Sequence, residues 1–246
     1  MSRVRPISTT LLLFTIVGTA SGCGDSSSTE PADDTGELVV SASPRAATGS
    51  TIRAASLAQA PVGDPASWIV GLYSFHISAN ANCSPPFITA FDGGGAAQRS
   101  DFMASPVLFT ATGLATGTYP CVAMRISDVL EYESASTSGA CTAGVTYRGD
   151  IYRAGGESAP FRDLNLAPIT ATGSDAVPSE DGVFILFTTD QSAAVARGFS
   201  ANQVIPLTTP LRVPDAVTFH WDATDAIVDD GGGRCLLEPG TPGLFR

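Results

Sequence analysis

Lysine is absent from this chain of 246 residues, and all 13 of its basic residues are arginine. The absence excludes a Walker-type phosphate loop, a Schiff base on lysine and a lysine general base. Positive charge is scarce as well, because 24 acidic residues outnumber the basic ones and give a formal net charge of −11 at pH 7. Since binding to phosphate needs clustered positive charge, the composition predicts that nucleic acid is not a partner.

Histidine is nearly absent too, so any mechanism based on histidine must use His76 or His220. Alternation along the strand expected there places Asp222 on the same face as His220, where the two side chains can form a hydrogen bond. Neither Ser138 nor Ser200 lies in the Gly-x-Ser-x-Gly turn that presents the nucleophile of α/β-hydrolases. A secreted hydrolase with a polar site around His220 and Asp222 is therefore the alternative prediction, and a polar pair on the solvent side of a sheet is the simpler interpretation.

The apolar stretch of residues 7–20 is interrupted by threonines and is shorter than the roughly 20 residues that a transmembrane helix needs. Arg3 and Arg5 precede this stretch and small residues follow it, an order that is typical of a cleaved export signal. The next residues, Ala20-Ser21-Gly22-Cys23, resemble the lipobox of bacterial lipoproteins, in which a signal peptidase cleaves before the cysteine and the cysteine sulfur carries a diacylglycerol.

The resemblance implies that residues 1–22 are removed as a signal peptide and that Cys23 becomes a lipidated N-terminus. Acyl chains, each worth roughly 0.8 kcal/mol per buried methylene, would then make the membrane a partner through the lipid anchor. Gly24 stands where lipoproteins retained in the inner membrane of enteric bacteria have aspartate, so the resemblance favours the outer membrane and leaves the periplasmic or surface face open. An ordinary cleaved secretory signal is the alternative.

Cysteine parity agrees with a lipidated Cys23, because the other four of the five cysteines form an even set. In an exported chain, Cys83, Cys121, Cys141 and Cys235 are expected to form two disulfides. Three connectivities are open. The pairing of Cys83 with Cys121 and of Cys141 with Cys235 is favoured, because it ties successive strands and then closes the C-terminal end. The set contains no CxxC pair, so a zinc site is not predicted.

Composition divides the rest of the chain into two parts. Residues 23–36 comprise the lipid-carrying cysteine and a polar, acidic stretch that is expected to be a flexible linker. Residues 37–246 contain short β-type segments between turn residues. This pattern predicts one all-β domain, an antiparallel β-sandwich with disulfide bonds and at most one or two short helices. Residues 113–119 resemble the turn before a strand in transthyretin-like and fibronectin-like sandwich modules.

The clearest strand signal covers residues 68–78. Strict alternation would place Tyr73 and Phe75 on one face of this strand and Ser74 and His76 on the other. Further strands are expected over residues 38–41, 87–91, 107–112, 119–132, 145–152, 183–188 and 217–221.

Three segments do not show simple alternation. Residues 183–187 are apolar throughout, so this strand is expected to be covered on both faces. Pro206 and Pro210 interrupt residues 204–213 and Pro214 follows directly, which predicts an edge or a loop. Residues 190–197 are expected to form a short helix with Asp190 as N-cap and Gly198 just past its end.

Aspartates gather near the C-terminus before three glycines, and their oxygens are the kind of ligand that calcium prefers. The residues are Asp222, Asp225, Asp229 and Asp230. Their spacing does not fit an EF-hand loop, so a flexible acidic turn is the favoured interpretation and no metal or other cofactor is predicted.

The sequence therefore predicts a lipid-anchored protein of the bacterial cell envelope, a non-enzymatic binding or structural module whose partner is an envelope protein or a glycan. A carbohydrate-binding module is a further alternative. It would present several coplanar aromatic side chains on an exposed face, and the candidates are Trp68, Tyr73, Tyr147, Tyr152 and Trp221.

Overall fold

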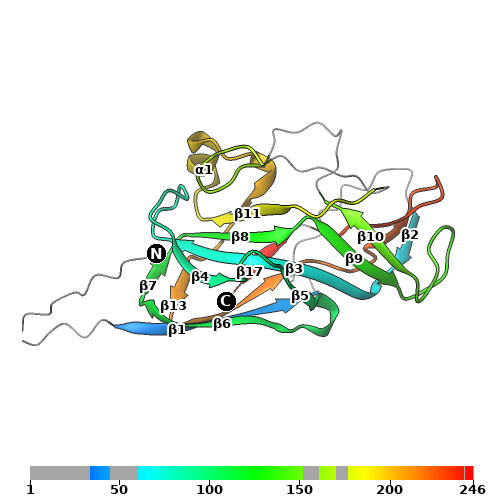
Figure 1. Cartoon of the computed structure of the whole chain (residues 1–246), viewed down its shortest axis with the longest axis horizontal. Helices are drawn as coiled ribbons and strands as arrows, with labels where there is room; N and C mark the ends of the chain where they lie inside the picture. Colours follow the sequence, from blue (N-terminus) through cyan, green and yellow to red (C-terminus); the bar gives the residue numbers. More distant parts are fainter. Residues whose placement is uncertain (1–33, 45–59, 152–160, 170–176, 241, 246) are drawn as a thin grey trace, which may run out of the picture. The chain divides into compact units, whose positions relative to one another are not determined.

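Strands dominate the computed structural model, which describes residues 34–44, 60–151, 161–169, 177–240 and 242–245 (Figure 1). The predicted signal peptide, Cys23 and residues 24–33 of the predicted linker lie outside the described residues. The first strand begins at Thr35, so the last two residues of the predicted linker already belong to a strand. Among the described residues, no helix is long and apolar enough to cross a membrane.

Two main sheets contain most of the strands. The smaller sheet has the order β17 (Gly243–Phe245), β14 (Asp215–His220), β1 (Thr35–Ser43) and β6 (Val107–Ala115). The larger sheet has the order β10 (Thr146–Asp150), β9 (Val129–Ser134), β3 (Pro65–Ser78), β8 (Cys121–Ser127), β11 (Gly182–Thr188) and β12 (Val204–Pro206). β3 also pairs with β4 (Ile88–Asp92) and β5 (Gln98–Asp101).

The remaining elements are short. Two small sheets contain β13 (Leu211–Val213) with β7 (Gly117–Tyr119), and β16 (Cys235–Leu237), β15 (Ile227–Asp229) and β2 (Ala60–Gly63). In the described ranges, the helical elements are α1 (Gln191–Arg197) and two 3₁₀ turns, Phe102–Ala104 and Ala201–Gln203. The predicted all-β fold with few helices is confirmed. Most strand pairs are antiparallel, but β1 with β14 and β11 with β12 are parallel.

Side chains from the two main sheets meet in one apolar core, called here the main core. Trp68 of β3 contacts Trp221, which follows β14, with ring centroids 5.1 Å apart. Phe187 of β11 contacts Phe219 of β14 with centroids 5.9 Å apart. The inner faces of both sheets therefore share a core, as in a β-sandwich.

A second apolar cluster lies on the opposite face of β11, on the side where Figure 1 shows α1. Val183 and Phe187 of β11 belong to the main core, whereas Phe184 and Leu186 belong to this second cluster. β11 is therefore covered on both faces, which confirms the prediction for residues 183–187.

The predicted helix is also present. Oδ1 of Asp190 accepts a hydrogen bond of 2.9 Å from the backbone N–H of Ala193, which caps the N-terminus of α1. Gly198 follows the last helical residue with a φ of 123°, a conformation that glycine adopts without steric strain.

Two disulfides connect the described strands and loops. One joins Cys83 to Cys121 and belongs to the second cluster, and the other joins Cys141 to Cys235 beside the main core. Of the three connectivities open to the sequence, this is the one favoured above.

The strand expected over residues 119–132 is in fact three strands, β7, β8 and β9, so that prediction is wrong. The first break is at Pro120, which has no N–H to donate to a ladder. The second is at Asp128, whose backbone N–H donates to the carbonyl of Asp181 at 3.0 Å instead of to a neighbouring strand. The stretch of residues 204–213 agrees with its prediction, because β12 is the edge strand of the larger sheet.

Candidate functional site

A cavity of about 470 Å³ lies on the outer face of the larger sheet, meaning the face opposite the main core. Side chains of β3, β8 and β11 line it, together with residues from the β4–β5 loop and from the segment 161–169. Its volume falls within the range of small-molecule sites, roughly 300–1,000 Å³.

A β-bulge in β3 determines which side chains face the cavity. The register of β3 against β8 shifts between Leu72 and Ser74. Leu72 faces the main core before the shift, and Phe75 faces it afterwards. Ser74 and His76 therefore point to the cavity, and Tyr73 lines it as well. The strict alternation predicted for this strand is wrong, because the bulge changes the face of the residues that follow it.

Arg125 of β8 supplies the positive charge of the cavity. Its Cζ lies 4.9 Å from the centre of the Tyr73 ring, within the range of a cation–π interaction. The guanidinium occupies space left by Gly182 of β11, since a Cβ at position 182 would lie only 2.7 Å from Cζ of Arg125. Among the described residues, no hydrogen bond or ion pair uses the guanidinium of Arg125.

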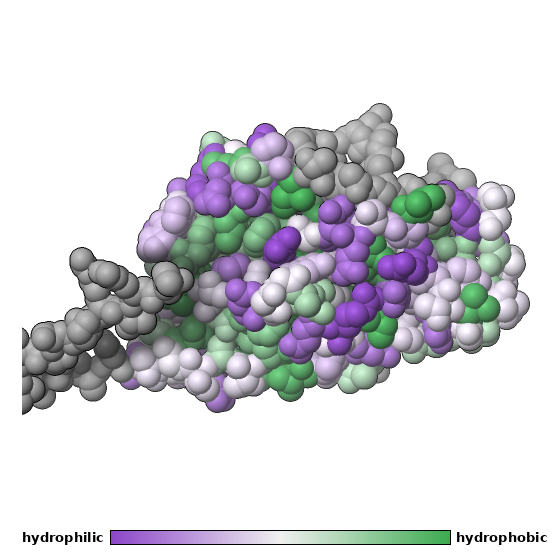
Figure 2. Space-filling model, in the orientation of Figure 1, coloured by the Kyte–Doolittle hydropathy of each residue, from purple (hydrophilic) through white to green (hydrophobic). Residues whose placement is uncertain are grey.

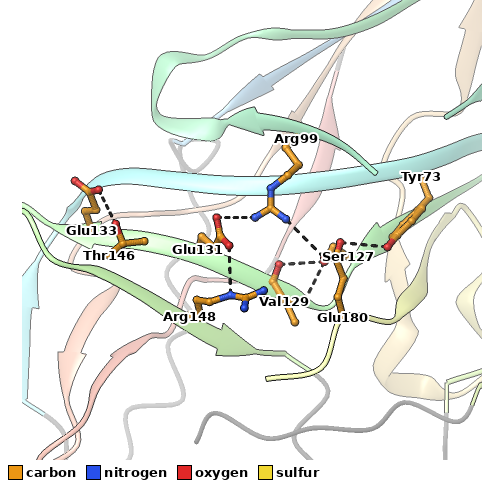
Figure 3. Close-up of polar contacts among 9 residues, drawn as sticks. All are labelled: Tyr73, Arg99, Ser127, Val129, Glu131, Glu133, Thr146, Arg148 and Glu180. Carbon is orange, nitrogen blue, oxygen red and sulfur yellow. Dashed lines mark hydrogen bonds and ion pairs between the residues drawn. The ribbon is translucent and has the colours of Figure 1, made fainter. Parts of the chain in front are cut away.

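Tyr73 connects the cavity to a series of ion pairs on the same face. Its hydroxyl donates to Oε1 of Glu180 at 3.1 Å, and Oε2 of Glu180 lies 3.7 Å from Arg99. Arg99 also pairs with Glu131 at 2.7 Å, which pairs with Arg148 at 3.3 Å. Figure 3 shows this series running from Tyr73 to Arg148. Burial raises the pKa of Tyr73, and the Glu180 charge raises it further, so the phenol keeps its proton and donates.

His76 has both ring nitrogens engaged by hydroxyl groups. Nε2 lies 2.8 Å from Oγ of Ser74, and Nδ1 lies 3.1 Å from Oγ1 of Thr89. Burial lowers the pKa of His76 and the Asp92 charge opposes this in part, so the ring is neutral near pH 7. One nitrogen then donates to a hydroxyl and the other accepts from one.

Two carboxylates complete the polar lining. Oδ1 of Asp92 accepts a hydrogen bond of 2.9 Å from the backbone N–H of Gly94. Oδ1 of Asp163 accepts from two backbone N–H groups at 2.8 and 2.9 Å. In the part of the chain that the structure describes, Oδ2 of each carboxylate takes no hydrogen bond and neither forms an ion pair with Arg125. The cavity therefore contains separated charges of both signs.

The structure does not join His220 to Asp222, the pair on which the hydrolase alternative depends. His220 is 4 % exposed, its ring centroid is 4.0 Å from that of Phe245, and its Nδ1 is buried without a partner. Oδ1 of Asp222 accepts from the backbone N–H of Thr224 at 3.0 Å. β14 ends at His220, and among the described residues the two side chains form no hydrogen bond, although the Asp222 charge partly opposes the lowering of the His220 pKa by burial.

Asp229 and Asp230, two of the C-terminal aspartates, are engaged by other groups of the protein. Oδ2 of Asp230 pairs with Nε of Arg234 at 2.7 Å. The pKa of Asp230 is lowered mainly by a hydrogen bond from the backbone N–H of Arg234, and next by this side-chain contact. Both carboxylate oxygens of Asp229 accept backbone hydrogen bonds. Among the described residues, no three acidic, histidine or cysteine side chains are grouped to hold a metal ion.

The aromatic candidates for a carbohydrate platform do not share one exposed face. Trp68 and Trp221 are buried in the main core. Tyr147 stacks on Tyr132 with centroids 5.9 Å apart, and Tyr152 lies outside the described residues. Tyr73 is the candidate that lines the cavity.

Three residues that line the cavity, Arg125, Asp92 and Asp163, are not among the site residues predicted from the sequence. A signal for Arg125 exists, because it is the one charged residue in the otherwise apolar run of β8. The two aspartates carry no comparable signal, since Asp92 ends β4 before a glycine-rich turn and Asp163 lies in a loop, as many aspartates do. Protein-family models, curated proteins and solved structures were compared with this chain and none matches it, so the chemistry of the site is argued from its geometry.

Proposed function

We propose that the protein is a lipid-anchored, non-enzymatic binding module of a bacterial cell envelope, and that the cavity on the outer face of the larger sheet is its ligand site. The observation that carries the proposal is the guanidinium of Arg125, held in a concave site without a counter-ion among the described residues. A guanidinium offers five N–H donors in a fixed geometry, so an oxygen-bearing ligand would satisfy donors that the protein leaves to solvent.

Binding is favoured over catalysis by the state of His76. Its two nitrogens contact Ser74 and Thr89, and no carboxylate among the described residues accepts a hydrogen bond from the ring. Without such a carboxylate, an imidazolium formed during a reaction would lack the hydrogen bond that usually orients and stabilises it, although the Asp92 charge acts on the ring.

A hydrolase remains the competing function, because Oγ of Ser74 lies 2.8 Å from Nε2 of His76, a distance that suits a nucleophile and its base. Hydrolysis of p-nitrophenyl acetate by the mature protein and by the Ser74→Ala variant separates the two functions. We expect equal rates. A rate that falls roughly tenfold or more in Ser74→Ala would assign a nucleophile and contradict the non-enzymatic proposal.

The binding site is tested by dialysing the mature protein against a low-molecular-mass extract of bacterial envelopes, then identifying retained compounds by mass spectrometry. The wild-type protein should retain a compound that Arg125→Gln loses. Arg212→Gln is the matched control, because Arg212 is an exposed arginine on β13 that does not line the cavity. Equal retention by Arg125→Gln, or no retention by the wild type, would contradict the proposal.

The lipid anchor rests on the likeness of Ala20-Ser21-Gly22-Cys23 to a lipobox and is tested separately. In the Cys23→Ala variant, we expect the signal to remain uncleaved at that point and diacylglycerol to be absent from the protein. Mass spectrometry measures both. An unchanged mass of the mature protein would contradict lipidation of Cys23.

A further inference from the structure

The charged side chains that line the cavity are complementary to a ligand that carries both a positive and a negative charge. Arg125 supplies one cation, and Asp92 and Asp163 also line the cavity. In each aspartate, one carboxylate oxygen takes no hydrogen bond among the described residues. His76 adds no charge near pH 7, because burial lowers its pKa.

We infer that the cavity binds a small zwitterion that bears a carboxylate and an ammonium group, in the chemical class of free α-amino acids and short peptides. The inference rests on the proposed function, since it names the ligand class of the same site. It depends on the separation of charges in the cavity, where Arg125 forms an ion pair with neither Asp92 nor Asp163 within the described residues.

The carboxylate of such a ligand would bind Arg125. A guanidinium binds a carboxylate through two parallel hydrogen bonds, and the charged partners make those bonds stronger than neutral ones. The orientation of the guanidinium is already restricted, because it lies over the Tyr73 ring and against Gly182. A restricted guanidinium loses less conformational entropy when the ligand binds.

The ammonium group of the ligand would bind the Asp92 or Asp163 carboxylate. Backbone N–H groups hold Oδ1 of each residue, which orients the carboxylates before a ligand arrives. Phe184 and Ile169 line the cavity as well, and they offer an apolar surface to a hydrocarbon side chain.

Ligands with a single charge fit these features less well. An anion would pair with Arg125 while facing two carboxylates, and a cation would leave Arg125 unpaired. A neutral sugar could hydrogen-bond to all three groups but would leave each charge without an opposite charge.

Isothermal titration calorimetry of the mature protein tests the inference with matched probes. L-leucine and glycyl-L-leucine are the zwitterions, N-acetyl-L-leucine carries the carboxylate alone, L-leucinamide carries the ammonium alone, and D-glucose is neutral. We expect a zwitterion to bind at least roughly tenfold more tightly than each of the other three compounds.

Variants then assign the contacts. Arg125→Gln, Asp92→Asn and Asp163→Asn are compared with the Arg212→Gln control, and circular dichroism spectra establish that each variant is folded. We expect Arg125→Gln and at least one aspartate variant to weaken zwitterion binding roughly tenfold or more, with no change in the control. Zwitterion binding that all three variants retain would overturn the inference.

The outcomes distinguish this inference from the proposed function. If D-glucose or N-acetyl-L-leucine binds as tightly as the zwitterions and Arg125→Gln loses that binding, the cavity is a ligand site but the zwitterion class is wrong. If no zwitterion binds, the inference is also wrong, and the retention experiment with the envelope extract decides the proposed function independently.

Discussion

The two faces of the larger sheet have opposite chemistry. The inner face contributes Trp68, Phe75 and other fully buried rings to the main core. The outer face carries arginines and glutamates in ion pairs, and Figure 2 shows hydrophilic side chains gathered over the region of β5 and β9. β3 contributes to both faces, and its bulge moves the polar residues Ser74 and His76 to the outer one. The difference indicates that the main core supplies most of the stability, whereas the outer face is available for recognition outside the part of β8 and β11 that the second cluster covers.

The largest loss of stability is expected on the inner face, at Trp68. This residue is 0 % exposed and contacts the rings of Phe102 and Trp221. Trp68→Ala removes a large side chain from a closely packed core and should lower the free energy of unfolding by about 3–5 kcal/mol. Urea unfolding followed by fluorescence or circular dichroism measures the change.

Trp68→Phe is the matched control. It keeps an aromatic ring in place and removes Nε1, which is buried without a hydrogen-bond partner, so the loss of stability should be clearly smaller than for alanine. A loss below about 1 kcal/mol in Trp68→Ala would show that the inner face does not carry the stability assigned to it.

A buried titrating group lies between two strands of the larger sheet. Asp128 is 0 % exposed and separates β8 from β9. Its Oδ1 accepts from the backbone N–H of Asp181 at 2.6 Å, and its Oδ2 is buried without a partner. The pKa of Asp128 is raised from 3.8 to about 7, mainly by burial and to a lesser extent by the charges of Asp150 and Asp181. The hydrogen bond from Asp181 acts in the opposite direction.

This pKa makes stability depend on pH. Between about pH 4 and pH 7 the folded protein keeps the Asp128 proton while the unfolded chain has lost it, so stability falls as pH rises through this window and levels off above pH 7. In Asp128→Asn this contribution to the pH dependence should vanish. A difference of about three between the folded and unfolded pKa changes the free energy of unfolding by at most about 4 kcal/mol, at about 1.4 kcal/mol per pKa unit.

Urea unfolding of both proteins at pH 4.5 and pH 8 checks this prediction. The wild type should lose stability relative to Asp128→Asn on going to pH 8. If the difference between the two proteins is the same at both pH values, Asp128 does not keep its proton in the folded state.

The features that sequence predicts well here depend on local chemistry. The caps of α1 are two residues that can be recognised beside the helix, Asp190 and Gly198. The covering of β11 on both faces follows from its lack of polar residues. The disulfide pairing is less local, and it was favoured among three because it ties successive strands and then closes the C-terminal end.

The structural features that were not predicted from the sequence depend on contacts between residues that are far apart in the chain. The bulge between Leu72 and Ser74 arises from pairing with β8, which lies some 50 residues later in the chain. The residues around the bulge do not predict it. The parallel pairing of β1 with β14 is also non-local. The cavity brings His76, Arg125 and Asp163 together from separate segments, so that their shared chemistry becomes visible only after folding.

A smaller effect is expected at Gly182, where the cavity meets β11. A Cβ at this position would overlap the guanidinium of Arg125, so Gly182→Ala should displace Arg125 from the Tyr73 ring. The loss of the cation–π contact amounts to about 0.5–1 kcal/mol at an exposed site, and zwitterion binding should weaken together with it. Urea unfolding and calorimetry measure the two effects.

Gly117→Ala is the control for Gly182→Ala, because a Cβ at position 117 meets nothing closer than 3.7 Å and the residue lies outside the cavity. We expect its stability to stay within about 0.5 kcal/mol of the wild type. Unchanged ligand binding in Gly182→Ala would mean that the position of Arg125 over Tyr73 does not matter for recognition.

The smallest effect is expected at Arg148, on the exposed side of the ion-pair series. Arg148→Gln removes a contact of 3.3 Å with Glu131, but Arg99 continues to pair with Glu131 at 2.7 Å. Exposed ion pairs contribute about 0–1 kcal/mol, so the unfolding free energy should fall by no more than about 0.5 kcal/mol. The change should also diminish in 1 M NaCl, because salt screens charges at the surface. Urea unfolding at low and high salt measures this. A loss above about 1.5 kcal/mol that persists in high salt would place structural stability on the outer face and remove the distinction between the two faces.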